Sequence, residues 1–444
     1  MNLEAFIDRQ KISAFHIGII AISAVICISD SYDALGMGYV APMMSEAWHL
    51  NRGAFAPVFA AGLVGLIIGA VVFGPLADII GGRSTILSCL FVYGILTLLT
   101  VMTGSVASLT VLRFFNGLAM GGILPNVIAL SSTFMPKHWR LLIATILALC
   151  FNLGTAVAGI CAAALMPRFG WQAVFWVGGV VPLIMIPIVW QWLPESLYYM
   201  VRTEAQRPYL IRNLKRIDPK LSVEQSTTFV MSEERPQGFP VKNLFTEGRA
   251  SMTVLIWIFG LMHTGALWFV QNWMPTLLHD AGFSISEAAS GTAVFYIGGV
   301  LGALLLGVLV SRKGILVFAA ATMLASILIA FIGTFGQTMA TVVAFSLAAG
   351  ALVVGTTQCA NAYVGAVLYA GFMRSTGMGW FIGVSRLGAL FIGTLGAGWL
   401  VSMSLSKETT FLVGASPEFL AGLSILALFL VQARSAGTRP LRHH

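Results

Sequence analysis

The chain has 444 residues, of which 58% are hydrophobic and only 9% are charged. Soluble proteins carry about 25% charged residues, so this chain lacks the polar side chains that would cover a water-exposed surface. The formal net charge of +8 would suit a nucleic-acid-binding protein, but the positions of the basic residues favour another explanation. The composition predicts an all-α protein embedded in a lipid bilayer.

The sequence offers no pattern for catalysis or for a cofactor. Its five cysteines lie in apolar stretches, without a CxxC pair or the paired spacing of a disulfide framework. No Ser/His/Asp set, metal-ligand cluster or phosphate-binding glycine loop occurs at a usable spacing. We therefore expect no cofactor, no metal and no enzymatic activity. The first apolar segment is too long for a signal-peptide core, so we expect it to be a retained helix.

Twelve apolar stretches are long enough to cross a bilayer, which takes about 20 residues in a helix. We expect an N-terminal six-helix bundle at 1–193 and a C-terminal one at 251–432. Between them, 194–250 reads as a cytoplasmic loop with short amphipathic helices. A cytoplasmic tail follows at 433–444, and its closing RPLRHH resembles vector-derived sequence. The expected spans are 15–41, 54–77, 86–104, 107–131, 140–165, 172–193, 251–277, 288–310, 314–335, 338–369, 373–402 and 409–432.

Basic residues concentrate on one side of these predicted spans. With both termini in the cytoplasm, 20 of the 25 lysines and arginines lie in inner segments, and only Arg52, Arg168 and Lys407 lie in outer ones. Because Lys and Arg accumulate in cytoplasmic loops, this asymmetry predicts the orientation and explains the net charge without nucleic acid. The remaining two, Arg113 and Arg386, lie inside spans.

The two halves of the chain echo each other. GPLADIIGGR (74–83) closes the second span and GVLVSRKG (307–314) closes the eighth, while Arg140 and Arg374 follow the fourth and the tenth. Parallel six-helix repeats are typical of transporters that work by alternating access, with the substrate site at the repeat interface. A receptor or a membrane enzyme has no reason for this symmetry.

Several of these motifs resemble a known family. GPLADIIGGR resembles the loop signature of the major facilitator superfamily, and LPESLYYMV (193–201) resembles its P-E-S segment. DSYD (30–33), RFFNGLAMGGILPNVIAL (113–130) and RSTGMGWFIGVSRLGAL (374–390) are similar to motifs of its aromatic acid:proton symporters. The resemblance covers nearly the whole chain. It implies twelve helices in two pseudo-symmetric bundles and a monomer that imports a benzoate- or hydroxybenzoate-type carboxylate with protons across the inner (plasma) membrane.

The chain departs from that family at three positions. Ser31 stands where the D-G-x-D motif has Gly, Thr133 where an acid usually ends the fourth span, and Ser311 where the second loop motif has Asp. The first departure is expected to change packing or selectivity at the site. The other two are expected to weaken salt bridges at the inner gate.

Asp30 and Asp33 are the acids that we place inside the predicted spans. A charged residue at mid-helix costs about 2.5–3.5 kcal/mol on the insertion scale and therefore needs a partner. At a rise of about 1.5 Å per residue, Asp30 and Arg113 reach similar depths, so we expect Arg113 to pair with one or both aspartates. The trio is either a permanent salt bridge or the proton-coupling site. In the second case, burial favours the neutral carboxyl, Arg113 favours the charged one, and substrate alters the balance.

Arg386 lies near the middle of the eleventh span, and we expect no acid in the C-terminal spans to pair with it. Its guanidinium either braces helix carbonyls or binds the carboxylate of the substrate in a bidentate manner. In the first case we expect Arg113 to be the anion ligand. Candidates to hold the ring and its hydroxyls, each with a packing interpretation beside it, are Tyr32, Asn126, His263, Trp268, Gln271, Trp273, Tyr296, Gln358, Asn361 and Phe381. His263 is also a candidate proton relay.

The inner gate is expected at Gly74, Asp78, Arg83, Arg140 and Arg374. There Asp78 would cap a helix N-terminus across the half-bundle and release it on opening.

Two other functions stay open. A proton-coupled exporter of drugs or metabolites would show uptake that an inward proton gradient inhibits. A non-transporting sensor or anchor would bind its ligand without flux, and the repeat speaks against it.

Overall fold

The computed structural model describes residues 2–203, 206–218, 244–246, 249–364 and 374–437, together with 221, 229 and 368. Within these ranges, twelve helices are long and apolar enough to cross a membrane. They agree with the predicted spans to within a few residues at most ends, which confirms the all-α membrane fold. The tenth span was predicted to reach residue 369, and its described helix ends at Tyr363.

The chain separates into two compact units. Unit 1 comprises Met1–Gly36, Ala61–Ala158 and Phe169–Glu234, and unit 2 comprises Met37–Ala60, Gly159–Arg168 and Arg235–His444. The division crosses three helices, so the last part of α2, the first part of α3 and the last part of α7 belong to unit 2. The domain boundary predicted near residue 193 stays a prediction about the two sequence repeats.

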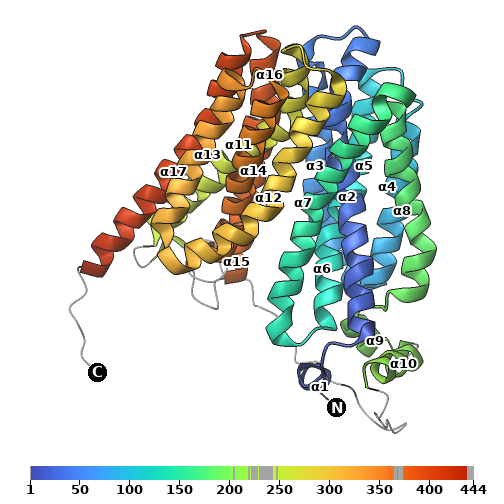
Figure 1. Cartoon of the computed structure of the whole chain (residues 1–444). Coiled ribbons are helices and arrows are strands. Elements are labelled where there is room, and N and C mark those ends of the chain that lie inside the picture. Colours follow the sequence, from blue (N-terminus) through green and yellow to red (C-terminus); the bar gives the residue numbers. More distant parts are fainter. Residues whose placement is uncertain are drawn as a thin grey trace. The chain divides into compact units, whose positions relative to one another are not determined.

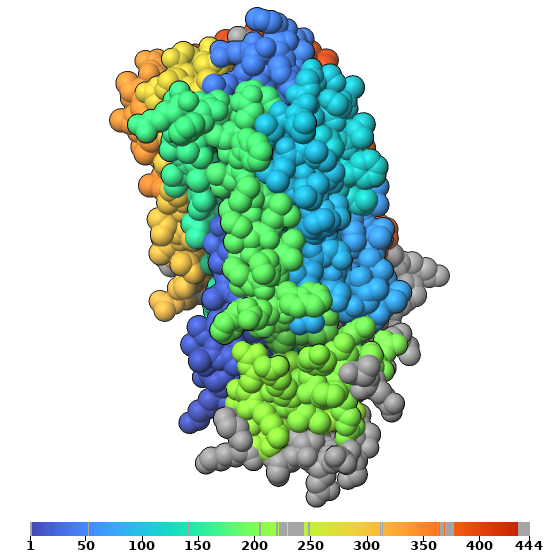
Figure 2. Space-filling model, turned by 90° about the vertical axis from the view of Figure 1, so that its right-hand side faces the viewer, coloured from blue at the N-terminus to red at the C-terminus, as the bar shows by residue number. Residues whose placement is uncertain are grey.

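Unit 1 is built from long apolar helices with short helices at one end. Figure 2 shows α8 and α4 side by side on one face of this unit, with α9 and α10 across their lower end. The helices with all or most of their length in unit 1 are α1 (Leu3–Asp8), α2 (Ala14–Ala47), α3 (Ala56–Ile80), α4 (Gly82–Thr100), α5 (Val106–Gly121), α6 (Ile123–Thr133), α7 (Lys137–Phe169), α8 (Gln172–Trp192), α9 (Leu197–Arg202) and α10 (Arg207–Ile217).

Glycines let α3 and α5 touch within unit 1. A Cβ atom added to Gly65 would overlap the Phe114 carbonyl oxygen, and one added to Gly117 would overlap the Gly62 carbonyl oxygen. The two backbones therefore meet directly, as they do at the small-residue interfaces of membrane helices. This close approach fixes the height of α5 and hence of Arg113, one turn before Gly117.

The segment after α8 contains the short amphipathic helix that the sequence predicts. α10 buries Leu210, Leu214 and Ile217 in the core of unit 1, and Arg216 places its Cζ 4.7 Å from the centre of the Phe15 ring. α1, α9 and α10 lie at the same end of this unit (Figure 1). Most of the predicted loop between 219 and 248 lies outside the described residues.

Unit 2 contains the last six spans. α12 packs along α14, α13 packs along α17, and α11 contacts α17, α15 and η6. The eleventh span is not uniform, because its middle, η6, is π-helical. The elements of unit 2, several of which Figure 1 labels, are η1 (Arg52–Phe55), α11 (Ala250–Asp280), α12 (Ile285–Lys313), α13 (Ile315–Phe335), α14 (Met339–Tyr363), α15 (Arg374–Gly388), η6 (Ala389–Gly396), α16 (Ala397–Ser402) and α17 (Lys407–Gly437).

The parts of α2 and α7 that belong to unit 2 pack closely against its own helices. A Cβ atom on Gly38 would lie 2.7 Å from the Gln271 carbonyl oxygen, so α2 meets α11 backbone to backbone. Ser286 on α12 donates a hydrogen bond of 2.9 Å to the Ala163 carbonyl of α7. At the end of α2, Glu46 Oε1 lies 2.8 Å from His279 Nε2. These contacts explain why the compact unit includes N-terminal residues.

Candidate functional site

A buried acid cluster lies in unit 1, where α2, α4 and α5 meet. Asp30 and Asp33, 3% and 1% exposed, are one turn apart on α2. Arg113 Nη1 lies 3.5 Å from Asp33 Oδ2, and Asn116 Nδ2 donates to the same oxygen at 2.8 Å. Asn116 Nδ2 is also 2.9 Å from Thr97 Oγ1 of α4. The structure thus brings Arg113 to Asp33, and the polar residues Asn116 and Thr97, which sequence reasoning missed, complete the cluster.

An aromatic ring holds the other side of the guanidinium. Arg113 Cζ lies 4.7 Å from the centre of the Phe175 ring on α8, within the range of a cation–π contact. The Nε and Nη2 atoms of Arg113 are buried and have no hydrogen-bond partner among the residues that the structure describes. Arg113 is therefore positioned by the Asp33 carboxylate and the Phe175 ring, while its Nε and Nη2 atoms have no described acceptor.

Asp30 has no comparable partner. Its Oδ1 is buried and accepts no hydrogen bond within the described ranges, where no basic side chain forms an ion pair with it. The nearby hydroxyls of Ser29 and Tyr93 hydrogen-bond to each other at 2.9 Å. Two buried carboxylates therefore have one guanidinium nearby, which contacts Asp33, and an uncompensated buried charge is costly. A proton on one carboxyl would leave the cluster neutral.

The residues between the two aspartates serve helix packing. A Cβ atom on Gly154 of α7 would overlap both Ser31 Oγ and the Ile28 carbonyl oxygen, so Ser31 lies directly against α7. The Tyr32 hydroxyl donates to the Val174 carbonyl oxygen of α8 at 3.2 Å. The departure at Ser31 thus falls at a helix–helix contact.

In unit 2, His263 belongs to a buried hydrogen-bonded network. Its Nδ1 lies 2.9 Å from Glu418 Oε2 on α17, and its Nε2 lies 2.7 Å from Thr357 Oγ1 on α14. His263 is 2% exposed and Glu418 is 0% exposed. Our expectation that the C-terminal spans contain no acid is therefore wrong. Glu418 lies inside the twelfth span, where the SPEF segment (416–419) is the sequence signal, and contact with His263 offsets the cost of burying it.

Arg386 differs from Arg113 in its surroundings. It is half-buried on α15, and within the described ranges it forms no hydrogen bond or ion pair. Its helix is tightly packed, since a Cβ atom on Gly388 would overlap the Leu261 carbonyl oxygen of α11. Arg386 therefore presents a guanidinium without a described protein acceptor on a helix that contacts α11.

The candidate ring-binding residues of unit 2 differ in their contacts. Gln271 and Tyr296 bond to each other, with the tyrosine hydroxyl donating to Gln271 Oε1 at 2.9 Å. Trp273 is buried and meets Phe59 edge-on, with 5.3 Å between ring centres. The remaining candidates are Trp268, Gln358 and Asn361, which are half-buried, and Phe381, which is buried against Gly260.

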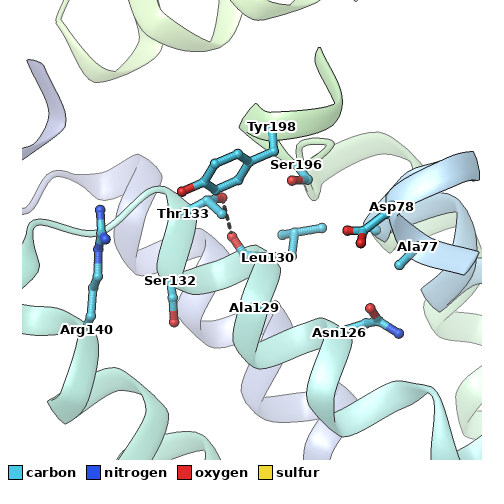
Figure 3. A pocket seen from close by; sticks show the side chains of 11 residues that line it. Ala77, Asp78, Asn126, Ala129, Leu130, Ser132, Thr133, Arg140, Ser196 and Tyr198 are labelled. Atoms are coloured by element: carbon cyan, nitrogen blue, oxygen red, sulfur yellow. Dashed lines mark hydrogen bonds between the residues drawn. The ribbon is translucent and has the colours of Figure 1, made fainter. Parts of the chain in front are cut away.

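A cavity of about 320 Å³ lies at the predicted inner gate of unit 1 (Figure 3). Figure 3 shows Asp78 and Arg140 on opposite sides of it. Thr133 Oγ1 donates to the Leu130 carbonyl at 2.7 Å, and Arg140 Nε donates to the Met135 carbonyl at 2.9 Å. Asn126, also in the lining, donates to backbone carbonyls. These side chains are thus bound to backbone rather than to one another.

Glu195 caps a helix in this region, a role that the sequence analysis did not give it. Its Oε1 accepts a hydrogen bond of 2.9 Å from the Arg83 amide at the start of α4. Gly81 precedes that helix with φ of +98°, and a Cβ atom there would clash with the Glu195 carboxylate. No described residue hydrogen-bonds to Asp78. Gly74 lies within α3 in open space, and the side chain of Arg374 lies outside the described residues.

Comparison with known proteins adds family information. The model of the Major Facilitator Superfamily matches residues 22–389. The gallate transporter of Pseudomonas putida is 33% identical over 429 residues, covering 96% of this chain and 95% of that protein. The 4-hydroxybenzoate transporter PcaK of the same organism is 29% identical over 443 residues, covering 98% and 97%. The crystal structure of the nucleoside transporter NupG shares the fold, with a TM-score of 0.68 at 16% identity, covering 94% of this chain and 99% of that one.

Proposed function

The chain belongs to the major facilitator superfamily and, within it, to the aromatic acid transporters, and from this premise we propose that it imports a benzoate- or hydroxybenzoate-type carboxylate together with protons by alternating access. It is a multi-pass membrane protein of a transporter family, not an enzyme. The relatives named for gallate and 4-hydroxybenzoate support the substrate class. The asymmetry of basic residues supports an inner-membrane protein with both termini in the cytoplasm.

The observation that carries proton coupling is the charge balance of the acid cluster. Asp33 has Arg113 and Asn116 as partners, whereas Asp30 Oδ1 has no described donor. Asp30 is therefore the carboxyl that holds a proton while the cluster is closed to water. Opening the cluster to one side lets water solvate a carboxylate, which lowers the cost of ionisation and releases the proton.

Arg386 is the proposed ligand for the carboxylate of the substrate. A guanidinium matches a carboxylate with two parallel hydrogen bonds, and that of Arg386 has no described acceptor in unit 2. Arg113 is already engaged by Asp33 and Phe175, so it is the second choice. Within unit 2, the aromatic and polar candidates are proposed to hold the ring of the substrate. Within unit 1, the residues around the inner-gate cavity are proposed to form the gate.

Energetics limit what coupling can achieve. One proton carried with a monoanion is electroneutral, so the pH gradient drives it with about 1.36 kcal/mol per pH unit. A second proton would add the membrane potential, about 2.3 kcal/mol per 100 mV. Two buried aspartates are compatible with either ratio.

Uptake into proteoliposomes tests the proposal. Labelled 4-hydroxybenzoate, gallate and benzoate are offered with and without an inward proton gradient, to the native protein and to Asp30→Asn. We expect gradient-driven accumulation of at least one acid by the native protein, and none by the variant. Uptake that the gradient inhibits would instead support an exporter, and binding without flux would support a sensor.

A further inference from the structure

The His263–Glu418 network is a second buried titratable cluster, and the proposed function does not use it. It connects three helices of unit 2, because His263 lies on α11, Thr357 on α14 and Glu418 on α17. His263 Nδ1 is 3.0 Å from Glu418 Oε1 and 2.9 Å from Oε2, and the imidazole stacks on Phe259 with ring centres 4.8 Å apart. Ring position and orientation are therefore fixed.

Hydrogen-bond accounting gives this network two protonation states. Thr357 Oγ1 lies 3.0 Å from the Val353 carbonyl, to which it can only donate. With that bond made, Thr357 must accept from His263 Nε2, and a second proton lies between Nδ1 and Glu418. This loaded state is neutral overall, as an imidazolium beside a carboxylate or as two neutral groups.

Loss of one proton changes the direction of a single hydrogen bond. Nδ1 then keeps its hydrogen and donates it to the Glu418 carboxylate, while Nε2 becomes an acceptor. The Thr357 hydroxyl turns from Val353 to Nε2 and donates there. This unloaded state carries a net negative charge. Both nitrogens of the imidazole are still hydrogen-bonded, while Thr357 has given up its bond to the Val353 carbonyl. Thr357 is half-buried whereas the other two are buried, so the proton enters and leaves on the Thr357 side.

We propose that His263, Glu418 and Thr357 form a second proton-binding site, in the C-terminal half of the chain, that carries one proton per transport cycle. This inference rests on the proposed proton-coupled import and adds a carrier to Asp30. The one covalent bond that forms and breaks is the N–H bond at Nε2, and the charge of the added proton is balanced by Glu418.

The position of Arg386 connects this site to the substrate. Gly260 lies one turn before His263. A Cβ atom added to Gly260 would overlap Oγ of Ser385, which is the residue before Arg386. The Ser385 side chain of α15 thus packs directly on the α11 backbone, next to Arg386 and one turn from His263. A shift of α15 when Arg386 takes an anion is therefore transmitted to the turn that positions His263.

The surrounding helices carry other charged and titratable groups that do not contact the His263–Glu418 pair through hydrogen bonds. Among the residues that the structure describes, none of them hydrogen-bonds to His263 or Glu418. They are His279 and Asp280 on α11, Glu287, Tyr296 and Arg312 on α12, Cys359 and Tyr363 on α14, Arg386 on α15, and Lys407 and Glu408 on α17, and α13 contributes none. The proton balance of the site is therefore set by the imidazole, the carboxylate and the threonine hydroxyl.

The number of protons carried per substrate tests the proposal. With the membrane potential held at zero and a fixed gradient of labelled 4-hydroxybenzoate across proteoliposomes, the pH gradient at which net flux vanishes gives this ratio. We expect Glu418→Gln to lower the ratio by one proton per substrate molecule relative to the native protein. If the native protein moves no protons with substrate, the proposed function fails. If the native protein does so and the variant has the same ratio, only the second site is overturned.

Threonine variants keep the test decisive if Glu418→Gln does not fold. Thr357→Val leaves the His–Glu pair but removes the hydrogen-bond partner of Nε2 in both states, so Nε2 no longer exchanges a proton through the hydroxyl and the ratio falls by one. Thr357→Ser restores the hydroxyl and the native ratio. Thr356→Val is the matched control, because the Thr356 hydroxyl bonds only to the Leu352 and Val353 carbonyls, and it keeps the native ratio. A native ratio in a folded Thr357→Val protein would overturn the proposal.

Discussion

The acid cluster of unit 1 and the histidine network of unit 2 handle buried charge in opposite ways. In unit 1, Asp33 is paired with Arg113 while Oδ1 of Asp30 lies without a described donor. In unit 2, both oxygens of Glu418 lie within 3.0 Å of one imidazole nitrogen. The first region needs a proton to become neutral, whereas the second can pass one through an imidazole whose two nitrogens stay hydrogen-bonded in both protonation states. A membrane protein can therefore bury a carboxylate by leaving it protonated or by giving it a titratable partner.

The largest expected effect comes from breaking the ion pair of unit 1. Asp33→Asn removes the carboxylate that contacts Arg113, and breaking a buried ion pair by removing one partner costs about 3–5 kcal/mol. We expect a lower melting temperature and no gradient-driven uptake, measured by thermal unfolding and by transport in proteoliposomes. The matched control is Asp33→Asn with Arg113→Gln, which removes both charges. It should recover most of the stability without recovering coupled uptake, and a single variant as stable as the native protein would contradict the pairing.

Replacing the other aspartate should separate stability from coupling. If Asp30 holds a proton in the closed cluster, Asn is close to it in shape and charge, so Asp30→Asn should change the free energy of unfolding by less than about 1 kcal/mol. Exchange of labelled for unlabelled substrate should continue, while accumulation against a gradient is lost. Strong destabilisation of this variant would mean that Asp30 is ionised, and the contrast between the two aspartates would disappear.

Replacing Arg386 tests which guanidinium binds the carboxylate of the substrate. A charged hydrogen bond contributes about 1.5–3 kcal/mol, so Arg386→Gln should raise the KM for 4-hydroxybenzoate about 10- to 100-fold. Inhibition by the uncharged amide of the same acid should change little, because it has no carboxylate to lose. Arg312→Gln, at an exposed position on α12, is the control. An unchanged KM in the Arg386 variant would transfer the role to Arg113.

The smallest effect is expected at Ser31. Its side chain packs on α7 at Gly154, so Ser31→Gly should weaken this contact and the helix by about 0.5–1 kcal/mol. The order of preference among benzoate, 4-hydroxybenzoate and gallate should stay that of the native protein, measured by competition for uptake. A reversed preference would show that this departure from the family motif acts on the substrate.

Sequence reasoning works well here for features set by chemistry along the helix axis. Span positions follow from runs of apolar residues, and the meeting of Arg113 with an aspartate follows from similar depth in the bilayer. Sequence reasoning fails for contacts that depend on the rotation of a helix about its own axis. Apolarity does not tell which side of a span faces a neighbouring helix, so neither the contact of Ser31 with α7 nor the capping of α4 by Glu195 was predictable. Glu418 was missed for a simpler reason, since the apolar residues around it masked an acid that the sequence displays.

The central claim is that substrate and protons move in the same direction, and the pH inside the vesicle tests it most directly. Proteoliposomes that contain a trapped pH indicator are prepared with equal pH inside and outside, and 4-hydroxybenzoate or gallate is then added outside. The account predicts that the interior becomes more acidic with the native protein and keeps its pH with Asp30→Asn. An interior that becomes alkaline as substrate enters, or substrate entry without any change in pH, would contradict it.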